Sequence, residues 1–225
     1  MRAQRRKLTK VAKFREDLEV GMDTVLTPKK PPINIIDENI LEVLSHAEIF
    51  SRDACVSILE ESPSEWEVST VNATHNSDAP LVRENYRNSL HHWIEPSTSN
   101  MELYDTLLAI TLAANKRFKF EIDMFEAVQL ARYEVGMHYN WHLDIGPGHM
   151  GNRKLSITVQ LSDPDSYEGG DLVLENGSAA EDVVASRELG SVTVFPSFMK
   201  HKVTPVTKGV RHSLVAWVSG VNRFR

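Results

Sequence analysis

The chain has 225 residues, a formal net charge of −6 at pH 7 and a single cysteine, Cys55. One cysteine excludes an internal disulfide and favours a reducing, cytoplasmic location. The net negative charge argues against electrostatic binding of the whole protein to nucleic acid. No apolar run approaches the ~18 residues expected of a membrane span, and no signal-peptide core is found at the N-terminus, so we expect no membrane association.

The first 33 residues differ in composition from the rest of the chain. They contain a run of basic side chains followed by prolines that break any helix, namely Arg2, Arg5, Arg6, Lys7, Lys10, Lys13, Arg15, Pro28, Pro31 and Pro32. We expect residues 1–33 to form a solvated, partly ordered arm and residues 34–225 to form the functional domain. Docking of this arm on a partner or an acidic surface, a targeting peptide and a role in self-association stay open as alternatives.

The next elements combine strands and helices. Apolar positions within 34–50 are compatible with an edge strand. Ser51 is a suitable N-cap for a helix that carries Ala54, Cys55, Ile58 and Leu59 at helical spacing and ends before Ser62-Pro63. Cys55 is then a small core residue.

A loop-rich segment precedes a second helix. Residues 66–96 mix strand-like pieces with Asn, Ser, Asp and Pro, which predicts short strands and loops. The string Ser99-Asn100-Met101-Glu102 matches a capping box. It is followed at helical spacing by Leu103, Leu107, Ile110, Ala114 and Phe118, so we expect a helix packed against a sheet.

From residue 120 onward the pattern changes to strands. Leu155, Ile157, Val159 and Leu161 alternate with polar residues, as in a strand with one buried face. Gly169-Gly170 and Asn176-Gly177 supply turns. We therefore predict a mainly β fold with helical support (α+β), in which strands form a jelly roll and helices pack on one sheet.

The segment around residue 142 contains a possible metal site. His142 and Asp144 have the spacing H-x-D, and residues two apart on a strand point to the same face of a sheet. His201 follows the strand-like run 191–195 and can supply a third ligand. Two imidazoles and one carboxylate form the facial triad of Fe(II) oxygenases, which leaves coordination positions open.

A possible anion anchor follows ten residues after His201. Arg211 begins the strand-like run that continues through residues 213–218. A guanidinium binds a carboxylate through two parallel hydrogen bonds, so an arginine near the triad indicates a carboxylate-bearing co-substrate such as 2-oxoglutarate.

Several strings in a fixed order carry a family resemblance. They are R-Y-x-x-G-x-x-Y-x-x-H-x-D at 132–144, R-K-L-S-I-T-V-Q-L-S-D at 153–163, E-G-G-D-L at 168–172, F-P-S at 195–197 and R-H-S-L-V-A-W at 211–217. Over roughly 130–220 the chain resembles the PKHD-type hydroxylases, which are relatives of prolyl 4-hydroxylase among the Fe(II)/2-oxoglutarate dioxygenases. Prolyl 4-hydroxylases usually have Lys where this chain has Arg211.

The resemblance implies a double-stranded β-helix fold and assigns roles to particular residues. His142, Asp144 and His201 would bind Fe(II), and Arg211 would bind 2-oxoglutarate. Tyr133 would hydrogen-bond the distal carboxylate of the co-substrate, and Ser213 could add a hydrogen bond to it. The reaction would use O2, release succinate and CO2, and hydroxylate a C–H bond, with ascorbate as the implied reductant.

The sequence leaves the substrate open. A peptidyl residue such as proline is the first expectation, and a free amino acid or other small metabolite is the alternative. A non-catalytic jelly-roll binding module has no need for a triad with an anion anchor, and a zinc hydrolase has no need for Arg211. We expect residues 66–98 and 145–154 to contact the substrate, and Tyr139, Trp141 and Trp217 to lie near the site or to have structural roles. His212 should point to the opposite face of its strand, and the remaining histidines are assigned no ligand role.

Overall fold

The structure is a computed structural model that describes residues 34–35, 42–72, 80–81, 85–176 and 181–223. The predicted arm at 1–33 lies outside the described residues. Antiparallel sheets make up most of the fold, with two α-helices and two short 3-10 helices in the described part of the chain. The helices are α2 (Arg52–Glu60), α3 (Met101–Phe118), η1 (Gly148–Asn152) and η2 (Pro164–Ser166).

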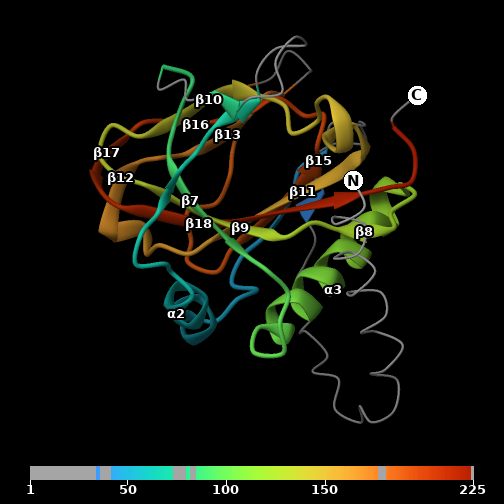
Figure 1. The fold of residues 1–225 in the computed structure, drawn as a ribbon, viewed down its shortest axis with the longest axis horizontal. Coiled ribbons are helices and arrows are strands. Elements are labelled where there is room, and N and C mark those ends of the chain that lie inside the picture. The colour runs from blue at the N-terminus through green and yellow to red at the C-terminus, as the bar shows by residue number, and fades with distance from the viewer. Residues whose placement is uncertain (1–33, 36–41, 73–79, 82–84, 177–180, 224–225) are drawn as a thin grey trace.

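The larger sheet runs through the middle of the molecule (Figure 1). Its strands are, in spatial order, β1 (Asn34–Ile35), β2 (Leu44–His46), β15 (Val192–Pro196), β11 (Arg153–Gln160), β18 (Arg211–Ser219), β9 (Val128–Tyr133), β7 (Leu90–Ile94) and β3 (Glu67–Val68), with β8 (Met124–Phe125) paired to the end of β18. The edge strand expected within residues 34–50 is present as β1 and β2.

A smaller sheet faces the larger one. Its spatial order is β14 (Val183–Val184), β13 (Leu172–Leu174), β16 (His201–Val203), β10 (His138–His142) and β6 (Arg87–Asn88). Two further pairs are β12 (Tyr167–Gly169) with β17 (Val206–Gly209), and β4 (Val71–Asn72) with β5 (Pro80–Leu81). The β13–β14 pairing fits the hairpin predicted at Asn176-Gly177, although Gly177 lies outside the described residues.

Both α-helices pack on the outer face of the larger sheet. Leu103, Leu107 and Ala114 of α3 and Cys55 and Ile58 of α2 join one core cluster with the apolar residues of β9, β11, β15 and β18. Figure 1 shows the helices on one side of this sheet and β10, β13 and β16 on the other. The predictions of helices on one sheet and of Cys55 as a core residue are therefore confirmed. Among the described residues, no helix is long and apolar enough to cross a membrane.

The alternating apolar and polar residues of β11 do not mark one buried and one exposed face, as was expected. Leu155, Ile157 and Val159 enter the helix-side core, as predicted. The polar face of this strand is not in solvent, because Ser156 and Gln160 are also buried and Thr158 lines an internal cavity. The prediction of a half-buried strand is wrong because the smaller sheet covers the polar face of β11.

The two helix N-termini test the capping predictions. The Ser51 hydroxyl accepts a hydrogen bond from the backbone N–H of Ala54, so the predicted N-cap of α2 is confirmed. The prediction of a capping box that begins at Ser99 is wrong, since Asn100 is the N-cap of α3 and makes no side-chain cap bond. Its amide instead accepts from the Ser97 N–H and donates to the Glu95 carbonyl, which ties down the preceding loop.

Candidate active site

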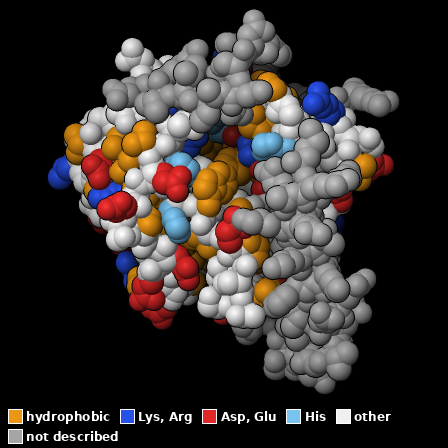
Figure 2. Space-filling view, in the orientation of Figure 1, with side chains coloured by type: hydrophobic (Ala, Val, Ile, Leu, Met, Phe, Trp, Pro, Cys, Tyr) orange, Lys and Arg blue, Asp and Glu red, His pale blue; other side chains and the backbone are white. Residues whose placement is uncertain are grey.

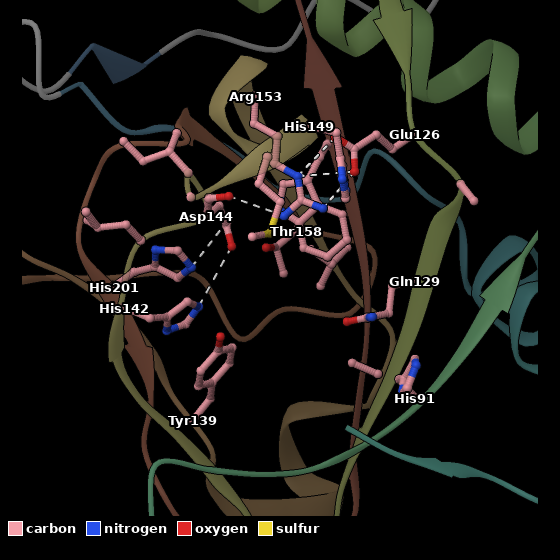
Figure 3. Close-up of a pocket in the computed structure, with 18 of the residues that line it drawn as sticks. His91, Glu126, Gln129, Tyr139, His142, Asp144, His149, Arg153, Thr158 and His201 are labelled. Atoms are coloured by element: carbon pink, nitrogen blue, oxygen red, sulfur yellow. Dashed lines mark hydrogen bonds and ion pairs between the residues drawn. The ribbon is translucent and has the colours of Figure 1, made fainter. Parts of the chain in front are cut away.

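The predicted triad residues come together between the two sheets. His142 ends β10 and His201 begins β16, and the two are register partners across these neighbouring strands. Asp144 is not on the strand, as the sequence suggested, but follows its end, where its backbone N–H donates to the Ser197 carbonyl at 3.0 Å. One ligand atom from each side chain lies within 4.8 Å of the other two (Figure 3).

Backbone carbonyls orient both imidazole rings. The Nδ1 atom of His142 is 2.8 Å from the Asn140 carbonyl, and Nδ1 of His201 is 2.9 Å from the Met199 carbonyl. A carbonyl can only accept, so each Nδ1 carries a proton, and in the neutral imidazole Nε2 then presents the lone pair. The Nε2 atoms lie 3.9 Å and 3.5 Å from oxygens of Asp144. Three unprotonated donors thus converge, which fits a divalent metal ion.

The electrostatics of the triad agree with this protonation. Burial, reinforced by the neighbouring His201, lowers the pKa of His142 to about 3. Burial alone would raise the pKa of Asp144, but His201, His142, Arg153 and the Ser156 hydrogen bond outweigh it and lower the pKa to about 2. At neutral pH the site therefore holds a neutral His142 and an ionised Asp144 in the form in which they bind metal.

A hydroxyl that the sequence analysis did not identify, that of Ser156, positions the Asp144 carboxylate and contacts the Ser197 hydroxyl in turn. Ser156 Oγ donates to Asp144 Oδ2 at 2.6 Å, and Ser156 and Ser197 hydroxyls are 3.0 Å apart. Ser156 belongs to the polar face of β11, so its role depends on which sheet covers that face.

We expect Ser156→Ala to weaken Fe(II) binding by about 10- to 100-fold, the usual effect of removing a hydrogen bond to a metal ligand. Anaerobic Fe(II) titration measures this change. Ser162→Ala serves as a matched control because Ser162 is also a buried serine, but its hydroxyl binds the backbone of residues 210 and 212. Equal affinities in the wild type and the Ser156 variant would show that Ser156 does not position Asp144.

Arg211 is a buried cation of the cavity. It is 3% exposed, and its Nη1 donates to Ser213 Oγ at 3.2 Å. No carboxylate lies within ion-pair distance of Arg211 in the described part of the chain. Because an unpaired buried charge is costly, this position suits an anion such as a carboxylate.

Tyr133 lies directly opposite Arg211 on the neighbouring strand β9. The guanidinium carbon is 5.6 Å from the centroid of the Tyr133 ring, and both residues line the cavity that contains the triad. Arg211, Ser213 and Tyr133 therefore lie together in the cavity that contains the triad.

The E-G-G-D-L string supports the position of Arg211. Gly169 and Gly170 both have positive φ, +70° and +66°. A Cβ atom on Gly170 would lie 3.0 Å from Cδ of Arg211 and 2.9 Å from a methyl group of Val206. Glycine thus allows the turn to approach the arginine closely.

The cavity has a volume of about 1250 Å³. Its walls include residues from both predicted segments, with Thr70, Arg87 and Trp93 from 66–98 and Ile145 and His149 from 145–154. On the face drawn in Figure 2, hydrophobic and histidine side chains gather around a hollow.

The aromatic residues near the motif divide between the cavity and its surroundings. Tyr139 and Trp217 line the cavity, whereas Trp141 lies outside it and packs under Lys200 and Lys202. His212 contacts Trp66 on the other face of β18, where burial, reinforced by Arg132, lowers its pKa to about 4. The predicted orientation of His212, away from the site, is therefore confirmed.

An ion pair that the sequence analysis missed closes one side of the cavity. Arg153 contacts Glu126 at 2.7 Å, donates to the Asp144 carbonyl at 3.3 Å and lies over the Trp217 ring at 4.1 Å (Figure 3). Arg153 occurs in a quoted string, but nothing in its local pattern indicates a partner 27 residues upstream.

Comparison with known proteins shows which families this chain resembles. The model of the 2OG-Fe(II) oxygenase superfamily matches residues 128–219. A PKHD-type hydroxylase of Synechococcus sp. (strain CC9605) is 32% identical over 149 residues, which are 64% of this chain and 63% of that protein. The chain spans 42% of the length of several other PKHD-type relatives that it matches.

Solved structures agree on the fold. A Pseudomonas putida prolyl-4-hydroxylase matches with a TM-score of 0.63 and 21% identity, over 80% of this chain and 93% of that one. A prolyl hydroxylase of Trichoplax adhaerens, in complex with a hypoxia inducible factor peptide fragment, matches with a TM-score of 0.59 and 15% identity. The match covers 79% of this chain and 83% of that one. The predicted jelly roll is confirmed.

Residues 128–219 match the 2OG-Fe(II) oxygenase superfamily, and the predicted resemblance to PKHD-type hydroxylases is confirmed. The superfamily and the His-Asp-His triad together imply Fe(II) and 2-oxoglutarate as cofactors.

Proposed function

We propose that this protein is an Fe(II)- and 2-oxoglutarate-dependent dioxygenase that hydroxylates a C–H bond of a peptidyl residue, with succinate and CO2 as co-products. The observation that carries the proposal is the presence of the metal triad and the unpaired Arg211 in one cavity. Neither feature has a use in a binding module of this fold, and a zinc hydrolase would not need the arginine.

The proposal assigns a task to each group. His142, Asp144 and His201 bind Fe(II), and Arg211 holds the distal carboxylate of 2-oxoglutarate with help from Ser213 and Tyr133. When bound, the metal and co-substrate supply the oxidising chemistry. The protein presents unprotonated ligand atoms, keeps Asp144 aligned through Ser156, and orients the co-substrate so that the target carbon enters from the open side of the cavity.

A peptide is preferred over a small metabolite for a physical reason. Cavities for small molecules usually have volumes of about 300–1,000 Å³, and this cavity is larger at about 1250 Å³. The prolyl hydroxylases among the structural neighbours support a prolyl target. We also propose residues 34–225 as the dioxygenase domain and residues 1–33 as an arm, with ascorbate as the reductant.

The test is succinate release by the purified, Fe(II)-loaded chain with 2-oxoglutarate and O2, with and without a panel of prolyl peptides and free amino acids. We expect slow succinate formation without substrate, faster formation with a peptide, and a product heavier by one oxygen atom. Acceleration by free amino acids alone would replace the peptide proposal with the small-metabolite alternative. The absence of succinate under every condition, together with no binding of 2-oxoglutarate, would overturn the enzymatic function.

A further inference from the structure

Arg87 is a second cation of the cavity, and it lies close to the triad. β6, which carries Arg87, pairs with β10, and Arg87 is the register partner of Tyr139. The guanidinium carbon lies 4.6 Å from the centroid of the Tyr139 ring. That ring stacks on the imidazole of His142, with centroids 3.4 Å apart and planes inclined by 10°. A single aromatic ring thus connects Arg87 to a proposed metal ligand.

Neutral acceptors hold the Arg87 guanidinium in place. Nε donates to Ser89 Oγ at 3.1 Å, Nη2 to Gln129 Oε1 at 3.1 Å and Nη1 to the Thr70 carbonyl at 3.5 Å. Gln129 is buried on the inner face of β9, and Figure 3 shows its amide on the cavity wall opposite Tyr139. A guanidinium has five N–H groups, so these three bonds leave two for a ligand.

Arg87 has no counter-charge in the described residues. The ion pairs there use the other cations, and no carboxylate lies within ion-pair distance of Arg87. In the same cavity, Arg153 is neutralised by Glu126 at 2.7 Å. Arg211 is assigned to 2-oxoglutarate. Of these three arginines of the cavity, Arg87 is therefore the one that still lacks an anionic partner among the described residues once the metal and 2-oxoglutarate are bound.

We propose that Arg87 binds a carboxylate of the substrate, so that this enzyme hydroxylates a residue beside an acidic side chain or beside a peptide C-terminus. The inference rests on the proposed function, since it assumes turnover in this cavity. An oriented guanidinium with free N–H groups recognises carboxylates through paired, charge-assisted hydrogen bonds. The competing explanation is structural: through Gln129, Arg87 connects β6 of the smaller sheet to β9 of the larger one.

Matched peptides separate these explanations in the Fe(II)-loaded full chain. The first pair is acetyl-Ala-Pro-Glu-amide and acetyl-Ala-Pro-Gln-amide, which differ in a side-chain carboxylate. The second pair is acetyl-Ala-Pro with a free C-terminus and its amide. Because charged hydrogen bonds contribute about 1.5–3 kcal/mol, we expect kcat/KM for one acidic peptide to exceed that of its amide by about 10- to 100-fold.

Arg87→Gln should reduce that ratio to near one and leave the KM for 2-oxoglutarate unchanged. Arg132→Gln is the matched control, because Arg132 is an arginine of β9 whose partner is Glu134 at 2.8 Å. It should retain the wild-type ratio. Arg87→Lys keeps the positive charge but lacks the two parallel N–H donors of a guanidinium. This variant should retain part of the preference for the acidic peptide.

The outcomes distinguish this inference from the proposed function. A wild-type ratio near one in both pairs, with succinate still formed without peptide, would overturn the role of Arg87 alone, and this result needs no variant to fold. A preference that survives in Arg87→Gln would make Arg87 a structural connector. A changed KM for 2-oxoglutarate in this variant would assign Arg87 to the co-substrate instead. No succinate under any condition would overturn the proposed function itself.

Discussion

Replacing His201 by alanine is expected to abolish Fe(II) binding and succinate formation. The three donor atoms lie within 4.8 Å of one another, and the variant leaves only His142 and Asp144. His201 also packs against the Phe195 ring at a centroid distance of 4.8 Å, so the substitution creates a small cavity. Metal content after anaerobic loading and desalting therefore has to be measured together with the thermal unfolding midpoint of the metal-free protein.

Controls separate loss of a ligand from loss of the fold. His142→Ala should have the same effect on iron, because the two imidazoles have equivalent positions and equivalent carbonyl partners. His212→Ala should retain iron, since His212 lies on the outer side of β18. Undiminished iron content in a folded His201 or His142 variant would show that the ligand assignment is wrong.

Replacing Arg211 by methionine is expected to weaken 2-oxoglutarate binding strongly while leaving the ligand-free protein as stable as the wild type or more stable. Charge-assisted hydrogen bonds to the guanidinium contribute about 1.5–3 kcal/mol. Their loss should raise the KM for 2-oxoglutarate by about 10- to 100-fold. Without ligand, the wild type contains a buried cation with no carboxylate partner in the described residues, and replacing such a charge by an apolar side chain is often neutral or stabilising.

Thermal unfolding with and without 2-oxoglutarate measures both effects. Excess 2-oxoglutarate should raise the unfolding midpoint of the wild type, because a ligand stabilises the state that binds it, and it should not raise that of the variant. Arg153→Met is the contrasting control: it leaves the mostly buried Glu126 carboxylate without its cation, so it should lower the stability of the ligand-free protein. A strongly destabilised Arg211 variant that still binds 2-oxoglutarate would assign the arginine a structural role.

Local patterns predicted part of the fold correctly. The apolar positions of β11 and of the two helices do enter one core, because periodicity reports which residues share a face. Periodicity does not report what covers the other face. The polar residues of β11 were expected in solvent, yet Ser156 contacts Asp144 under the smaller sheet. The capping box failed for a related reason, since Asn100 has competing partners in the loop before α3.

The sequence by itself determined the kind of chemistry: the H-x-D spacing, the later histidine and the arginine ten residues beyond it specify donor types and their order, which are local properties. Only the tertiary structure decided which charges have partners. Glu126 reaches Arg153 and Gln129 reaches Arg87 because separate strands bring them together, whereas Arg211 and Arg87 have no carboxylate partner within the part of the chain that the structure describes. Charge compensation depends on distances between residues far apart in the chain. Arg211 could be predicted from its spacing to His201, but Arg87 could be recognised as a second cation of the cavity only in the folded molecule.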